Sequence, residues 1–294
     1  MNSIIKPVRM DYNTNIRVLE DLIKEFPFLN TEIQGRSALG RGIFSFSIGN
    51  IRKNSVIVGG FHGTDLLSGL LLMLFTERLC RSVKYGSQMC GTDVKRALSQ
   101  VGITVIPCIN PDGREIALKG FEAAKNLRTY LSDISPSGHK EWKANAFGVD
   151  IGKNFSRGWS ECRQEEYETH SAIPSSSGYC GEHAESEAET KSLTRLCRMK
   201  GFTRCMSLMA GKNELCHHSG DSTPAVGTMM GKIFADSVSC PFRKNTDDAA
   251  SFCRWFAEEF SKPAFTLGID CSSPEKLYSA YDRIEEALLL FLLM

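Results

Sequence analysis

The chain has 294 residues, in which 35 Lys and Arg balance 34 Asp and Glu to a formal net charge of +1. Because positive and negative charges are nearly equal in number, the protein has no overall electrostatic attraction for a nucleic acid or an anionic membrane. We expect neither as a partner. With 42% hydrophobic and 23% charged residues, the composition excludes fibrous and disordered classes and predicts a folded globular protein.

The amino-terminal part of the chain predicts a helix followed by strands. Residues 14–26 carry apolar side chains at helical spacing, with Thr14 as the expected N-cap and Pro27 as the stop. Residues 42–49 alternate as a half-buried strand does. Residues 55–60 form a β-branched apolar run, which is typical of a strand covered on both faces.

Helices and strands continue to alternate after this point. Residues 66–85 predict a long helix, and residues 103–109 predict a second buried strand. Residues 186–197 predict a helix capped by Ser186, because Glu189 follows at the spacing of a capping box.

Two more strands are expected at residues 204–209 and 264–269, the second preceded by a helix around residues 249–260. This alternation predicts an α/β fold with a largely parallel sheet, whose ligand sites lie at the carboxyl ends of the strands. No repeat, low-complexity tract or linker divides the sequence. We therefore expect a single domain over residues 1–294.

The sequence carries no membrane or secretion signal that we recognise. Its longest apolar run, residues 66–75, falls short of the roughly 18 residues that a transmembrane helix requires. Pro7, Arg9 and Asp11 interrupt the region where a secretion signal needs an apolar core. We expect a cytoplasmic protein whose eleven cysteines, none of them in a C-x-x-C pair, are reduced scattered thiols rather than disulfides, many of them packed as small hydrophobes.

A histidine and an acidic residue follow the strand expected at residues 55–60. His62 and Asp65 occupy the turn into the next helix. An imidazole nitrogen and a carboxylate oxygen at this spacing can converge on a divalent metal ion. The same residues also suit a polar loop position and a first-turn acid that interacts with the helix dipole. The pair alone leaves both interpretations open.

Six segments give a more specific signal through their order and spacing. They read S-A-L-G-R-G-I-F-S-F-S-I-G from Ser37, S-V-I-V-G-G-F-H-G-T-D, I-P-C-I-N-P-D-G, W-K-A-N-A-F-G-V-D-I-G-K-N-F, S-E-A-E-T-K-S-L and K-P-A-F-T-L-G-I-D. From about Tyr12 to the end, the chain resembles the zinc carboxypeptidases. The W-K-A-N segment from Trp142 and the W-F pair from Trp255 resemble most the bacterial branch that cleaves γ-D-glutamyl-diamino acid bonds in cell-wall peptides.

The resemblance implies a three-layer α/β/α sandwich around a mixed, largely parallel sheet. It also implies a zinc ion held by the His and Glu of an H-x-x-E motif and by a second His after a later strand. A Glu at the end of the last core strand then activates the metal-bound water, and Asn and Arg side chains bind the terminal carboxylate of a peptide. Three protein ligands leave one position open for that water, whose proton a nearby carboxylate must accept.

Only part of this metal site is matched in the sequence. His62 matches the first ligand, while Asp65 stands in place of the Glu. Met209 occupies the position of the second His, and a thioether is a poor zinc ligand. His217 and His218 are the nearest imidazoles and serve as replacements only if their loop folds back. We expect zinc binding to be weak or absent.

The catalytic and substrate-binding positions have also changed. Gly268 stands where the resemblance places the catalytic Glu, and Asp270 is a weak candidate to replace it because it lies roughly 7 Å further along an ideal strand. At the substrate positions, Gly152 replaces Asn, Lys153 replaces Arg, and Phe147 stands where this branch commonly has Arg. The charge at position 153 survives, but the bidentate guanidinium does not.

These departures leave three hypotheses. The chain is a relic without chemistry, a module that binds a peptide or a cell-wall peptide fragment without cutting it, or an active zinc-dependent carboxypeptidase or γ-D-glutamyl-diamino acid peptidase with a rebuilt metal site. Inactivity is favoured, because an active enzyme needs both a replacement ligand and a replacement base.

Overall fold

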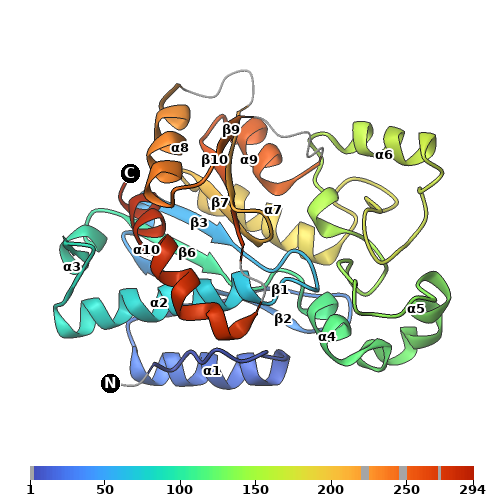
Figure 1. Cartoon of the computed structure of the whole chain (residues 1–294), viewed down its shortest axis with the longest axis horizontal. Helices are drawn as coiled ribbons and strands as arrows, with labels where there is room; N and C mark the ends of the chain where they lie inside the picture. Colours follow the sequence, from blue (N-terminus) through green and yellow to red (C-terminus); the bar gives the residue numbers. More distant parts are fainter. Residues whose placement is uncertain (1–2, 220–224, 245–249, 271–272) are drawn as a thin grey trace.

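An eight-stranded mixed sheet forms the middle of the protein, in the order β1-β2-β6-β3-β7-β10-β8-β9 (Figure 1). The computed structural model describes residues 3–219, 225–244, 250–270 and 273–294. The strands of this sheet are β1 (Asn30–Arg36), β2 (Gly42–Gly49), β3 (Asn54–Val58), β6 (Gly102–Ile106), β7 (Cys205–Ala210), β8 (Glu214–His218), β9 (Phe242–Lys244) and β10 (Ala264–Ile269). A separate small sheet pairs β4 (Gln88–Met89) with β5 (Thr92–Asp93).

The centre of the large sheet is parallel and its flanks are not. The four strands β6, β3, β7 and β10 run in one direction, whereas β2 and β8 run antiparallel to their inner neighbours. The carboxyl ends of β3, β7 and β10 therefore meet at one edge, as the predicted alternation of strands and helices implies.

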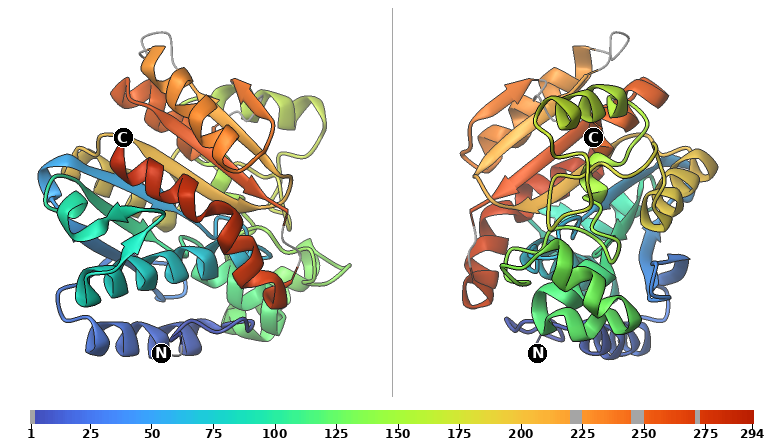
Figure 2. Two further views of the ribbon diagram at one scale, coloured as in Figure 1. Left: turned by 60° about the vertical axis from the view of Figure 1, so that its left-hand side comes forward. Right: turned by 90° about the vertical axis from the view of Figure 1, so that its right-hand side faces the viewer.

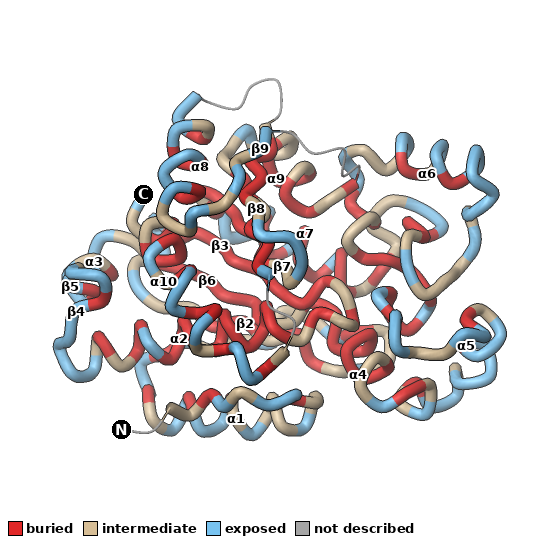
Figure 3. The backbone as a smooth tube through the Cα atoms, viewed as in Figure 1, coloured by how far each residue is buried: buried red, intermediate tan, exposed pale blue. Residues whose placement is uncertain are grey.

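Helices cover both faces of the sheet. The first face packs against α1 (Tyr12–Glu25), α2 (Leu67–Tyr85), α8 (Ala225–Ser237) and α10 (Leu277–Leu293), and the second against α7 (Ala188–Lys200) and α9 (Phe252–Phe260). Figure 2 shows α10 crossing the face that α2 also covers. The expected three-layer α/β/α sandwich is confirmed, and the central strands β3, β6, β7 and β10 are largely buried between the layers (Figure 3).

The remaining helices lie outside these two layers. They are α3 (Val94–Leu98), α4 (Pro111–Lys119), α5 (Arg128–Ile134) and α6 (Trp159–Glu168). The chain between α4 and α7 is largely irregular and faces the viewer in the right-hand view of Figure 2. No helix in the described part of the chain is long and apolar enough to cross a bilayer.

Two expected helix caps differ from the structure. The first helix begins at Tyr12, because the Asp11 side chain accepts a hydrogen bond from the backbone N–H of Thr14. The helix α7 begins at Ala188 without a side-chain cap. Ser186 lies one residue before the N-cap, Glu187, and its hydroxyl instead accepts from Asn154 and donates to Glu187.

Buried amides fix the loops beyond the strand ends. Asn110 caps α4 by accepting from the Gly113 N–H, and its amide donates to the carbonyls of Phe61, Lys143 and Ala144. One side chain thus joins the loops that follow β3 and β6 to the segment at residues 143–144. This network sets the positions of the residues described next.

Candidate functional site

A cleft of about 420 Å³ opens beyond the carboxyl ends of β3, β7 and β10. Its lining includes residues that the sequence singled out and several that it did not: Phe61, His62, Lys143, Asp150, Gly152, Lys153, Cys162, Glu165, Ser207, Met209, Phe252 and Thr266. The cleft lies at the sheet edge where α/β folds commonly bind ligands.

His62 forms an ion pair with Asp150 on the cleft wall, with 3.5 Å between Nε2 and Oδ1. Burial alone lowers the pKa of His62, but the charge and hydrogen bond of Asp150 outweigh it and raise that pKa above its usual 6.5. Burial likewise raises the pKa of Asp150, but His62 and the Gly178 N–H together bring it down to about 2. The carboxylate is thus ionised near neutral pH and favours the imidazolium form of His62.

Asp65 is close to His62 in the chain but serves the backbone. Its Oδ1 accepts from the N–H of Ser68 at 3.1 Å, in the first turn of α2, and its Oδ2 accepts from the N–H of Ala210 at 3.2 Å. The side chain is buried and is not part of the cleft lining. The carboxylate therefore stabilises the start of α2 and joins it to the end of β7.

Met209 and Gly268 lie side by side as register partners in β7 and β10. The connection from β7 to β8 must cross the end of β10, because β10 lies between those strands. It crosses directly over Gly268. A Cβ atom at this glycine would lie within 3.0 Å of the backbone carbonyl oxygen of Lys212, a separation that real Cβ atoms essentially never show.

The candidate replacement residues lie outside the cleft lining. His217 is on the face of β8 opposite to that of His218, and its ring packs at a tilt against Phe265 with the ring centroids 5.2 Å apart. Burial lowers its pKa to about 4, so its ring is neutral. His218 lies behind the cleft wall, with Nε2 2.9 Å from Oγ1 of Thr266. Asp270 is exposed and borders a separate hollow.

The three substrate positions have different surroundings. Gly152 leaves little room, since a Cβ there would lie 3.2 Å from Oδ1 of Asp150 and 3.6 Å from Nε2 of His62. Lys153 lines the cleft. Phe147 is 45% exposed and lies outside the cleft lining, where its backbone carbonyl accepts from Tyr130. A second cation in the cleft is Lys143, which sequence reasoning missed although it stands in the quoted W-K-A-N segment.

A sequence profile of the zinc carboxypeptidases matches residues 16–262, which is most of the chain. The chain belongs to the zinc carboxypeptidase family. It is 22% identical over 285 residues to γ-D-glutamyl-L-diamino acid endopeptidase 1 of Lysinibacillus sphaericus, which covers 96% of this chain and 71% of that protein. It is 25% identical over 255 residues to the uncharacterized protein YqgT of Bacillus subtilis (strain 168), and this match covers 85% of this chain and 67% of that protein.

Solved structures share the fold of this family member. The thrombin-activatable fibrinolysis inhibitor superposes with a TM-score of 0.74 at 14% identity, covering 97% of this chain and 74% of the other. The murein-tripeptide amidase MpaA of Escherichia coli O157 superposes with a TM-score of 0.55 at 19% identity, covering 87% of this chain and 92% of the other. The relatives and the fold agree with the resemblance to the bacterial branch.

The family implies zinc, but the residues present at its position do not match a catalytic zinc site. The cleft lining holds one imidazole, on His62, and the thioether of Met209. The nearby carboxylate of Asp65 has a backbone N–H on each oxygen. Within the described residues, the one set of three ligand-type side chains with donor atoms within 4.8 Å of one another includes neither His62 nor Asp65. No step of a reaction is therefore derived through zinc.

Proposed function

We propose that this protein is a catalytically inactive member of the zinc carboxypeptidase family that binds the carboxylate end of a peptide without cutting it. The observation that carries the proposal is the crossing of the Lys212 carbonyl over Gly268. The position of the catalytic base not only lacks a side chain but has its space filled by backbone. General base catalysis requires a group within hydrogen-bond reach of the attacking water.

The metal-binding groups support the same conclusion. Zinc in a hydrolytic site needs three protein ligands and prefers nitrogen, thiolate or carboxylate donors. Met209 is a neutral thioether, and Asp65 would have to give up two backbone hydrogen bonds to turn toward an ion. We therefore propose that zinc binding by His62, Asp65 and Met209, at the position of the family's catalytic zinc, is weak or absent.

The cleft keeps features that suit an anionic ligand. Lys143 and Lys153 line it together with His62, which tends toward its cationic form, and these three outnumber the acidic residues Asp150 and Glu165 in the lining. Charge-assisted hydrogen bonds from such groups to a carboxylate contribute about 1.5–3 kcal/mol each. Because relatives are named for γ-D-glutamyl-diamino acid and murein-tripeptide cleavage, we propose cell-wall peptides as the ligand class and a cytoplasmic setting in which the cysteines stay reduced.

The test compares binding and cleavage in the same preparation. We expect a γ-D-glutamyl-diamino acid peptide with a free terminal carboxylate to bind in calorimetry and to remain intact for hours, with added zinc or with a chelator. The amidated peptide should bind at least tenfold more weakly. Lys143→Met should reduce binding of the free acid, whereas Lys140→Met, a change at an exposed lysine outside the cleft lining, should not.

Two results would overturn the proposal. Zinc-dependent cleavage that a chelator abolishes would favour the alternative of an active peptidase with a rebuilt metal site. Equal affinity for the free-acid peptide and its amide would show that the lysines do not recognise the terminal carboxylate.

A further inference from the structure

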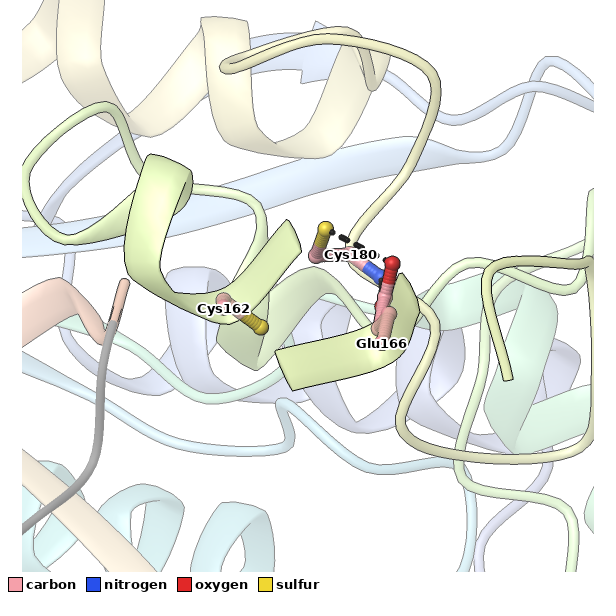
Figure 4. A group of neighbouring side chains, drawn as sticks. All are labelled: Cys162, Glu166 and Cys180. Atoms are coloured by element: carbon pink, nitrogen blue, oxygen red, sulfur yellow. Dashed lines mark hydrogen bonds between the residues drawn. The ribbon is translucent and has the colours of Figure 1, made fainter. Parts of the chain in front are cut away.

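Three ligand-type side chains converge beside the cleft (Figure 4). Cys162 and Glu166 lie on α6, and Cys180 lies in the irregular segment that follows it. Their sulfur and carboxylate oxygen atoms all lie within 4.8 Å of one another. All three residues are buried. The spacing of four residues puts Cys162 and Glu166 on one face of the helix, and the returning chain brings Cys180 to that face.

Surrounding groups already orient Glu166 and Cys180. The Cys180 N–H donates to Oε1 of Glu166 at 2.5 Å, and the Cys180 thiol donates to Oε2 at 3.2 Å. Arg163 forms an ion pair with the same carboxylate at 3.0 Å, and its guanidinium stacks on the rings of Trp159 and Tyr179. Hydrogen bonds of this kind to a carboxylate commonly position metal ligands.

The charges permit a cation here. With protonated thiols, the negative charge of Glu166 and the positive charge of Arg163 cancel. If both thiols lose their protons and a dication enters, two thiolates, one carboxylate, one guanidinium and the ion again sum to zero. A buried cluster that is neutral in both states avoids the cost of an uncompensated charge.

We propose that Cys162, Glu166 and Cys180 bind a thiophilic divalent cation of the zinc class, at a site separate from the position of the family's catalytic zinc. Two thiolates with one carboxylate are a zinc-type donor set, and water supplies the fourth position. Each thiol releases its proton to solvent as its sulfur binds, so one ion displaces two protons. The ion would join α6 to the segment carrying Cys180. That segment also supplies Ser177 and Gly178 to the cleft lining.

The test uses the full chain, purified with reductant, freed of metal by a chelator and titrated with Zn²⁺. We expect one zinc ion per chain and the release of about two protons per ion in weakly buffered solution near neutral pH. Zinc is spectroscopically silent, so Co²⁺ serves as a second probe. It should give a thiolate-to-cobalt charge-transfer band that zinc abolishes. These measurements on the unaltered chain do not depend on whether a variant folds.

Variants then locate the ion. Cys162→Ser and Cys180→Ser should each weaken zinc binding by about 100-fold or more, since losing a direct ligand exceeds the 10- to 100-fold effect of an outer hydrogen bond. Cys90→Ser changes an exposed cysteine and should leave the affinity unchanged, as should His62→Ala. Three results would overturn the proposal: no stoichiometric zinc, zinc lost with His62→Ala and retained without the two cysteines, or a Cys162–Cys180 disulfide in the reduced preparation.

Discussion

Gly268 of β10 and Met209 of β7 are partners in the parallel register of two neighbouring strands. The positions where the sequence resemblance places the base and the second imidazole are therefore adjacent in space. The Lys212 carbonyl crosses above this pair and fills the space that a side chain on Gly268 needs. In the proposed inactive protein, the lack of a base at position 268 thus involves the path of the backbone as well as the identity of one residue.

Placing a methyl group at position 268 should destabilise the protein. Gly268→Ala forces either Lys212 or β10 to move, and overpacking of this kind typically costs about 1–3 kcal/mol. The measurement is the free energy of unfolding in urea. Gly211→Ala is the matched control. Gly211 lies in the same β7–β8 connection as Lys212, and a Cβ there meets no atom within 4 Å. Equal free energies of unfolding for the two variants would contradict the claim that the Lys212 carbonyl fills the space beside Gly268.

The sequence predicted the centre of the fold well because that centre depends on local patterns. The buried strands β3 and β6 are β-branched apolar runs, and β10 lies at the predicted residues 264–269. The strand β8 was missed, because Glu214–His218 mixes acidic, apolar and imidazole side chains without a simple period. Its burial comes from neighbours distant in the chain.

For the candidate site, the sequence could predict only which residues belong to it and not how they are arranged. Motif order located His62, Met209 and Gly268 in one region, and the structure brings the first two into one cleft. The two backbone bonds to Asp65 and the crossing of Lys212 depend on the relative positions of separate strands, which no local pattern records. Cysteine spacing likewise gave no sign that Cys162 and Cys180 would meet.

The ion pair of His62 and Asp150 should make stability depend on pH. The pKa of His62 is higher in the folded protein than in the unfolded chain, so its contribution is complete below pH 6.5 and is lost as pH rises through the folded value. We expect His62→Gln to cost on the order of 1 kcal/mol at pH 5 and less at pH 8. Urea unfolding at both values measures this. A cost that grows with pH would contradict the assigned direction.

Arginine at position 153 should improve ligand binding. Its planar guanidinium can donate two parallel hydrogen bonds to a carboxylate, whereas the amine of Lys153 acts as a point charge. We expect Lys153→Arg to strengthen binding of a free-acid peptide severalfold and Lys153→Met to weaken it about tenfold. Titration calorimetry with the acid and its amide measures both changes. A Lys153→Met variant that binds the acid as well as the unaltered chain would exclude a role for this residue.

Restoring single residues should not restore hydrolysis. Gly268→Glu supplies a base in blocked space and without a well-held metal ion, and Met209→His supplies a ligand without a base. Catalytic groups that act as a unit are strongly non-additive, so each variant should stay near background. The combination Asp65→Glu, Met209→His and Gly268→Glu has the best prospect of measurable zinc-dependent cleavage. It still has to displace the Lys212 crossing, and Gly152 and Lys153 still differ from the family's substrate residues.

The assay follows cleavage of a γ-D-glutamyl-diamino acid peptide with zinc, with a chelator, and after zinc is restored. Cleavage by the unaltered protein at about 1 per second or faster, a rate typical of enzymes, would show that a base other than residue 268 serves this cleft.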